Sequence, residues 1–386
     1  MPPAHPLPPL PAIAVRLARL EAFVFRCPIE TPVRTSFGTM HDRPAVFVRA
    51  EDEDGAVGWG EAWCNFPSCA AEHRAKLIET LFAPLAVGRP FASAAAAFAE
   101  LTRSTAVLAI QSGEPGPIAQ AIAGVDLALW DLAARRAGAP LWRLLGGTSD
   151  RVAVYASGIN PERPQDTVAA KFAAGHRSFK LKVGFGETRD VENVRVVRAQ
   201  LGSGARLMLD ANQAWSLEEA RRIAPQLAAF DIGWLEEPLR ADRPVAEWHL
   251  LHGATRIPLA GGENLIGEDA FSAAIGAGAL AVVQPDVAKW GGISGCWPVI
   301  DKIRAAGLRY CPHYLGAGVG LLASAHLLAA AGGDGLLEID ANANPLRTSL
   351  SASLAAVHDG SARLGESPGI GIDIDPARLR ALCAAG

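Results

Sequence analysis

The chain has 386 residues, half of them hydrophobic, which is enough to bury one large core and a smaller second one. Its formal net charge is only −4 and Lys and Arg form no long run, so a nucleic-acid partner is not expected. A membrane partner is not expected either, because no uncharged apolar stretch reaches the about 18 residues of a spanning helix.

The N-terminal segment Met1–Pro11 is rich in proline and lacks the basic and apolar regions of a signal peptide, so we expect a loose tail. The six cysteines contain no CxxC pair, which argues against a zinc ribbon or a thioredoxin-like site. In a chain of this length they are predicted to be free thiols of a reducing compartment. Cytoplasm is therefore the expected location.

Residues 1–143 have the pattern of an α+β domain. Strands are predicted at Leu20–Arg26, Ala45–Ala50 and Ala56–Glu61, the last two joined at Asp54-Gly55, a strong hairpin turn signal. Helical patterns follow at 71–84 and 91–105. Pro117–Gly138 is the clearest helix, since it begins with Pro, ends before Gly and carries one apolar stripe.

After residue 144 short apolar runs alternate with helical stretches, which predicts repeated βα units and parallel strands. Eight such units indicate a (β/α) barrel of the TIM type over 144–345. Residues 346–386 return to loops and a short helix, and are expected to pack back on the first domain. The predicted barrel strands are Val152–Ala156, Ser178–Val183, Arg206–Leu209, Gly233–Leu235, Pro258–Ala260, Ala281–Val283, Leu308–Cys311 and Leu336–Ile339.

Polar residues follow the apolar strands at one regular place. From Lys182 onward they are separated by about 23 to 28 residues, close to one βα unit each. Such residues would meet at the C-terminal mouth of a barrel, where barrel enzymes carry their sites, although a charged residue can also end a strand only to reach water. The set comprises Lys180, Lys182, Asp210, Asn212, Glu236, Glu263, Asp286, His313 and Glu338.

Three carboxylates of this set, Asp210, Glu236 and Glu263, follow neighbouring strands. Brought together without a cation they would repel one another strongly. Oxygen-only ligation favours a hard ion, which predicts a catalytic Mg²⁺ with room for substrate oxygens. The alternative is a network of ion pairs with Lys or Arg.

Two further groupings predict acid–base chemistry. Lys180 and Lys182 lie two apart in one strand and share a face, so each should lower the pKa of the other and let one act as a base. Asp286 and His313 end successive strands, and a carboxylate beside an imidazole fixes its tautomer. The alternatives are solvated lysines and a structural histidine.

These residues lie in stretches by which the sequence resembles the enolase superfamily, specifically its mandelate racemase subgroup. The resemblance runs over nearly the whole chain. The matching stretches are Phe179-Lys180-Leu181-Lys182-Val183-Gly184, Leu209-Asp210-Ala211-Asn212, Leu235-Glu236-Glu237-Pro238, Gly262-Glu263-Asn264, Gln284-Pro285-Asp286, the His313 and Glu338 strand ends, and the helix Ala123–Asp131.

The resemblance implies a modified barrel with a capping domain, a Lys or His base and Mg²⁺. It implies that Lys180 and the ion stabilise an enediolate, that Lys182 is the base on one face, and that His313, oriented by Asp286, acts on the other. Glu338 would bind the substrate carboxylate as the protonated acid, and Asn212 would support the metal side.

Specificity in this family comes from capping-domain loops, here Thr31–Arg43 and Trp63–Pro67. Arg34 and His41 are therefore expected to contact the substrate, although most surface arginines are only solvated. The expected partner is a small-molecule carboxylate substrate, and symmetric assemblies in the family suggest a homo-oligomer.

Three functions stay open. Dehydration of a sugar acid or hydroxy acid is favoured, because it is common in the subgroup. Racemisation or epimerisation of a 2-hydroxy or amino acid derivative uses the same two bases. A non-catalytic binding protein would have lost a ligand or a base, and none is missing here.

Overall fold

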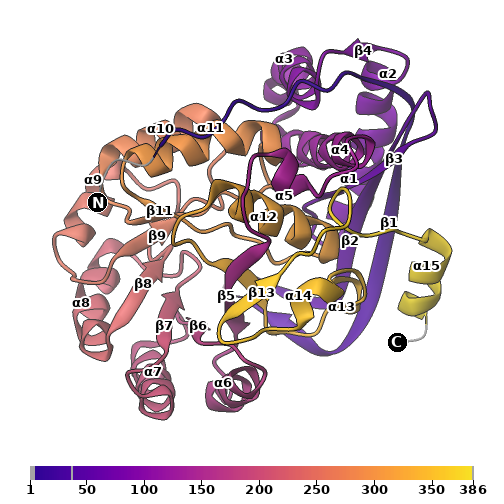
Figure 1. The fold of residues 1–386 in the computed structure, drawn as a ribbon. Coiled ribbons are helices and arrows are strands. Elements are labelled where there is room, and N and C mark those ends of the chain that lie inside the picture. Colours follow the sequence, from indigo (N-terminus) through magenta and orange to yellow (C-terminus); the bar gives the residue numbers. More distant parts are fainter. Residues whose placement is uncertain (1–4, 36–37, 385–386) are drawn as a thin grey trace.

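The computed structural model describes residues 5–35 and 38–384, which form two sheets and the helices around them (Figure 1). The smaller sheet is antiparallel with the order β3-β2-β1-β4. The three predicted strands lie together in this sheet. The first two are much longer than predicted and pair as a long antiparallel ribbon, with Phe23 opposite Phe47. The strands are β1 (Val15–Arg34), β2 (Thr39–Asp52), β3 (Val57–Ala62) and β4 (Pro90–Phe91).

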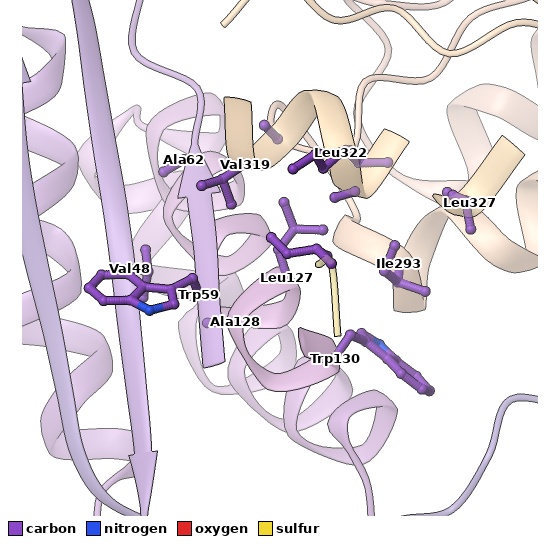
Figure 2. Packing of buried hydrophobic residues seen from close by; sticks show 14 of the residues in the cluster. Val48, Trp59, Ala62, Leu127, Ala128, Trp130, Ile293, Val319, Leu322 and Leu327 are labelled. Carbon is purple, nitrogen blue, oxygen red and sulfur yellow. The ribbon is translucent and has the colours of Figure 1, made fainter. Parts of the chain in front are cut away.

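Helix α4 (Pro115–Arg136) is the core element of this N-terminal part and lies between the small sheet and the barrel helices (Figure 2). Gly60 of β3 permits this contact, because a Cβ there would lie 2.0 Å from the Gly124 carbonyl oxygen. α4 is long and apolar enough to cross a membrane by composition alone, but 89% of its most apolar window is buried in the protein. Its apolar surface is therefore used in the core.

The other helices of this part are α1 (Ala70–Leu77), α2 (Ala83–Ala86), α3 (Ala94–Ser112) and α5 (Leu141–Leu144), with a π-helical turn at Ile78–Phe82.

The larger sheet contains the eight predicted barrel strands in the order β11-β10-β9-β8-β7-β6-β5-β12, all parallel. The last strand pairs with the first, as a barrel requires, while β11 and β12 meet where the Leu336 amide donates to Cys311 Sγ at 3.4 Å. The predicted barrel with an N-terminal α+β domain is thus confirmed. The strands are β5 (Arg151–Ile159), β6 (Ser178–Lys182), β7 (Arg206–Asp210), β8 (Ile232–Glu236), β9 (Leu259–Gly261), β10 (Val282–Val283), β11 (Arg309–Tyr310) and β12 (Leu337–Asp340).

Helices follow the barrel strands and cover them on the outside (Figure 1). They are α6 (Pro164–Ala173), α7 (Glu187–Leu201), α8 (Leu217–Leu227, continued by a 3₁₀ turn at Ala228–Phe230), α9 (Val245–His252), α10 (Glu268–Ala277), α11 (Gly292–Ala305) and α12 (Gly318–Ala331). The C-terminal segment adds α13 (Pro345–Leu350), α14 (Ala352–Ala355), β13 (Ser361–Arg363) and α15 (Pro376–Ala384).

This C-terminal segment touches both parts of the molecule, because β13 pairs with β5 and α15 packs on β1. The boundaries at 143 and 345 stay predictions. The prediction of a loose N-terminal tail is wrong for its described residues. Leu7 donates its amide to Asp301 at 2.8 Å, and Pro8 accepts from the Trp297 indole at 2.9 Å, so the tail is held on α11.

The prediction of six free thiols is also wrong for two of them. Cys27 of β1 and Cys383 of α15 form a disulfide, because the packing of α15 on β1 brings their Cα atoms to 4.3 Å. The other four cysteines are free. Disulfides are rare in reducing compartments, so this bond weighs against the reasoning that led to cytoplasm, and that location stays a prediction.

Reduction of this disulfide is expected to lower the free energy of unfolding by about 2–4 kcal/mol, because the bond closes a loop of 356 residues in the unfolded chain. Urea unfolding with and without dithiothreitol measures the change. Cys27→Ser should unfold at the lower urea concentration in both conditions. Six titratable thiols in the denatured, unreduced protein would contradict the assignment.

Candidate active site

The ends of strands β6, β7 and β8 bring charged side chains side by side at one mouth of the barrel. Lys182 is in register with Asp210, and Asp210 with Glu236. Residues in register on neighbouring strands that share a face lie close together, so the regular spacing in the sequence becomes a row of charges in space. All three side chains are buried.

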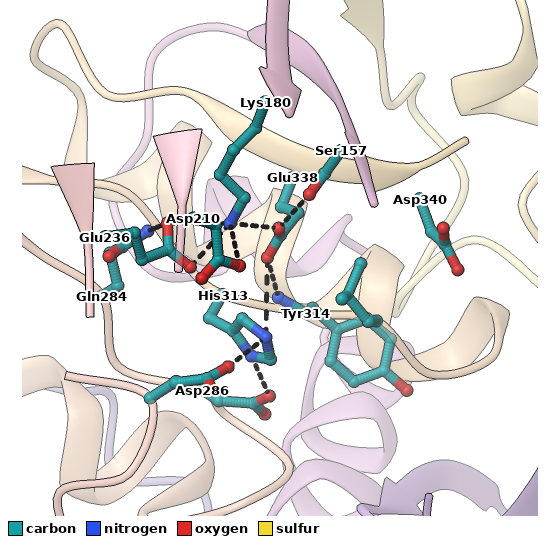
Figure 3. A network of polar contacts seen from close by, with 12 residues as sticks. Ser157, Lys180, Asp210, Glu236, Gln284, Asp286, His313, Tyr314, Glu338 and Asp340 are labelled. Carbon is teal, nitrogen blue, oxygen red and sulfur yellow. Dashed lines mark hydrogen bonds and ion pairs between the residues drawn. The ribbon is translucent and has the colours of Figure 1, made fainter. Parts of the chain in front are cut away.

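Lys180 is at the centre of this row and is fully buried (Figure 3). Its Nζ lies 2.6 and 2.7 Å from the two Glu236 oxygens and 2.7 Å from Glu338 Oε1. Burial works to lower the pKa of Lys180, but Glu236 and Glu338 outweigh it and raise the pKa well above its usual value. Lys180 is therefore a fixed positive charge at the floor of the site.

Lys182 lies nearer the cavity and donates to Asp210 Oδ2 at 2.6 Å and to Asn212 Oδ1 at 2.5 Å. The expectation that the two lysines lower each other's pKa is not met in this arrangement. Burial and Lys180 do work to lower the pKa of Lys182, but the Asp210 carboxylate outweighs them and the pKa is raised. The Asp210 carboxylate, which is in direct contact, therefore shifts the pKa of Lys182 more than the neighbouring Lys180 ammonium group does.

The imidazole of His313 joins three carboxylates. Its Nδ1 lies 2.7 Å from Asp286 Oδ2, so the predicted pair is present, and its Nε2 contacts Glu263 and lies 3.8 Å from Glu338. Burial alone would lower the pKa of His313, but Glu263 and Glu338 outweigh it and raise the pKa well above the usual value. Asp286 also accepts from the Ala288 and Lys289 amides, which holds the carboxylate still.

Glu338 connects Lys180 with the His313 side of the site. Ser157 of β5 donates to its Oε1 at 2.5 Å and the Tyr314 amide donates to its Oε2 at 3.0 Å (Figure 3). Burial would raise the pKa of Glu338, but Lys180 and His313 outweigh it and lower the pKa. These contacts favour the carboxylate, whereas the family resemblance implies the protonated acid, and the protonation state of Glu338 with substrate bound stays a prediction.

No group of three or more His, Cys, Asp or Glu side chains within residues 5–35 and 38–384 is drawn together in a metal-binding arrangement. Asp210, Glu236 and Glu263 instead each contact a Lys or His side chain, which is the alternative considered from the sequence. Burial raises the pKa of Glu236 to about 7 even so, which indicates that its charge is under-compensated.

The charges of the site still fit a divalent cation. Burial and the neighbouring Glu263 raise the pKa of Glu237 well above its usual value, so added positive charge would stabilise the ionised form of these carboxyl groups. The donor set is all oxygen, as Mg²⁺ prefers.

A cavity of about 220 Å³ opens between the capping-domain loops and the barrel mouth. Lys182, Asn212, Glu263 and His313 line it, and so does Arg34, as expected from the sequence. His41 is exposed and is not among the lining residues, so the structure does not bring it to this cavity.

Sequence reasoning missed several residues of the site. Ser157 lies within β5, directly after the predicted strand Val152–Ala156. The sequence hint for it was that this strand, alone among the eight predicted, had no polar residue assigned to its end. Glu61 of β3 crosses from the capping domain and accepts from the Ala317 and Gly320 amides at the start of α12. The sequence feature that could have pointed to Glu61 is a carboxylate inside an otherwise apolar strand. The other missed residues are Asn160, Gln284, Lys289, Asp340 and Asn342.

Parallel βα units, a cap over their C-terminal mouth, and a buried row of lysines, carboxylates and one histidine define a barrel enzyme of the enolase type. Residues 165–378 match the family model for the enolase C-terminal domain-like fold, and residues 19–146 match the N-terminal domain of mandelate racemases and muconate lactonizing enzymes. The chain therefore belongs to the enolase superfamily, in its mandelate racemase group.

Known relatives match this sequence over nearly its whole length. The 3,6-anhydro-α-L-galactonate cycloisomerase of Streptomyces coelicolor is 33% identical over 369 residues, 94% of this chain and 98% of that protein. The crystal structure of a mandelate racemase/muconate lactonizing enzyme from Bordetella bronchiseptica RB50 is 60% identical with a TM-score of 0.92, covering 96% of this chain and 100% of that one.

The crystal structure of a racemase from Streptomyces coelicolor A3(2) with bound magnesium is 31% identical, with a TM-score of 0.83. The match covers 95% of this chain and 99% of that one. Other relatives are sugar-acid dehydratases. This protein is thus an enzyme.

Proposed function

We propose that this enzyme removes the proton next to the carboxylate of a sugar acid or hydroxy acid and expels the neighbouring β-hydroxyl as water. The observation that carries the proposal is that Lys182 and His313 line the same cavity, each hydrogen-bonded to a carboxylate that orients it. A base and an acid that face one bound substrate are what such an elimination requires.

Asp210, Glu236 and Glu263 would hold Mg²⁺. When bound, the ion would supply positive charge that stabilises the negative charge developing on the substrate carboxylate. Lys182 would take the α-proton once it is neutral, and Lys180 would stabilise the resulting enediolate from the floor of the site. His313 would give its proton to the departing hydroxyl, so that water and an enol form, and the enol becomes a 2-keto acid.

Racemisation or epimerisation is the second candidate, because Lys182 and His313 could exchange the same proton from opposite faces. Incubation of sugar acids and hydroxy acids with the enzyme and Mg²⁺ in D₂O distinguishes the two. Dehydration would give a semicarbazide-reactive product lighter by one water. Deuterium exchange with inversion and without a keto product would refute dehydration and favour racemisation.

Removal of divalent ions with EDTA is expected to abolish turnover, and Mg²⁺ should restore it. Binding to the folded state alone should also stabilise the protein, by about 2.7 kcal/mol at a hundredfold excess over Kd. Thermal unfolding with and without Mg²⁺ provides this second readout. A doubly changed variant, Asp210→Asn with Glu263→Gln, should lose the stabilisation, and a full response in it would contradict the assigned ligands.

A further inference from the structure

Two basic side chains at the cavity lack an acidic partner. Lys289, after β10, and Arg34, at the end of β1, both line the cavity. In the described part of the chain neither forms an ion pair within 4.0 Å, whereas Lys182 and Arg43, which also line the cavity, are both paired with carboxylates. Their positive charge is therefore available to a bound anion.

Lys289 is held in place without being neutralised. Its Nζ donates to Asn264 Oδ1 at 2.8 Å and lies 4.9 Å from the centre of the Trp63 ring. The Trp63 amide donates to the Ala288 carbonyl at 3.1 Å, so the capping-domain loop fixes the segment that carries the lysine. A half-buried ammonium group with an amide and an aromatic face as neighbours keeps free hydrogen-bond donors.

The wall of the cavity is rich in amides. Asn65, Asn160, Gln213 and Asn342 line it, and Asn160 donates to Asn342 at 3.0 Å. Side-chain amides both donate and accept, as hydroxyl groups do. Asn264, which accepts from Lys289, donates to Glu263 Oε1 at 3.1 Å, so one amide separates Lys289 from a carboxylate proposed to hold the metal.

We propose that Lys289 and Arg34 form a subsite for a second carboxylate, so that the preferred substrates are sugar diacids rather than monoacids. The inference rests on the proposed function, in which the first carboxylate lies at the barrel floor. A short polyhydroxylated chain then spans the amide wall, and its far carboxylate pairs with the two cations. A monoacid of the same configuration presents only a hydroxyl there.

The test compares hexaric acids with the hexonic acids of matching configuration, using the Mg²⁺-loaded full-length enzyme. The wild type is expected to favour the diacid at least tenfold in kcat/KM and in Kd from titration calorimetry. Lys289→Met should reduce this preference at least tenfold, mainly through KM. The control Lys302→Met removes the same charge from α11 at a site paired with Glu268, and should keep the preference.

Equal or better binding of monoacids by the wild type would overturn the subsite, and so would an equal loss for both acids in Lys289→Met. Lys289→Gln repeats the test if the methionine variant fails to fold. Titration calorimetry measures the Kd of each acid whether or not the enzyme turns it over. Diacid preference without any α-proton exchange in D₂O would therefore overturn the proposed reaction and leave the subsite standing.

Discussion

His313→Asn is expected to lower kcat by about 10²–10⁴-fold, the usual contribution of one general acid or base, and Lys182→Ala should do the same. Asparagine keeps a hydrogen-bond donor for its neighbours but has no proton to transfer at neutral pH. Neither residue is among the proposed metal ligands, so stabilisation by Mg²⁺ should persist in both variants. Steady-state kinetics and thermal unfolding measure the two effects.

The two variants should differ in D₂O. In a dehydration Lys182 still removes the α-proton when His313 is absent, so His313→Asn should retain exchange into the substrate while Lys182→Ala loses it. His249→Asn on the exposed face of α9 and Lys76→Ala on α1 are matched controls and should behave as the wild type. Turnover retained in both active-site variants would rule out the mechanism.

The barrel could be predicted because its strands are short, buried runs that end in polar residues at a constant register. Lys182, Asp210 and Glu236 are neighbours in the ladder as well as at regular intervals in the sequence. α4 was predicted for a similar reason, since Leu129 and Leu132 share its apolar stripe and are buried. Local patterns suffice where the fold repeats one unit.

What could not be predicted depends on contacts between distant segments. Cys27 and Cys383 meet only because α15 returns to β1. The sign of the pKa change at Lys182 depends on which carboxylate touches it, and at Glu338 on Lys180 and His313 together. The spacing of residues places such groups at one mouth, but it does not say which of them pair.

A buried ion-pair cluster beside the cavity is expected to have the largest effect on stability. Asp340 lies 2.8 Å from Arg43 of the capping domain and 3.3 Å from Arg347 of α13, and all three side chains are buried. Asp340→Ala should lower the free energy of unfolding by about 3–5 kcal/mol, because it leaves two buried guanidinium groups without a counter-charge. Urea unfolding measures the loss.

Arg43→Met should cost less than Asp340→Ala, since Asp340 keeps Arg347 and the methionine fills part of the space. If Arg43→Met were as costly, packing or the Arg43 hydrogen bond to the Leu315 carbonyl would dominate instead of charge. A triple variant, Arg43→Met with Asp340→Leu and Arg347→Met, separates these terms. Replacing a whole buried ion cluster by apolar groups of similar volume is often neutral or stabilising. The triple variant should therefore be more stable than Asp340→Ala, although it changes three residues instead of one.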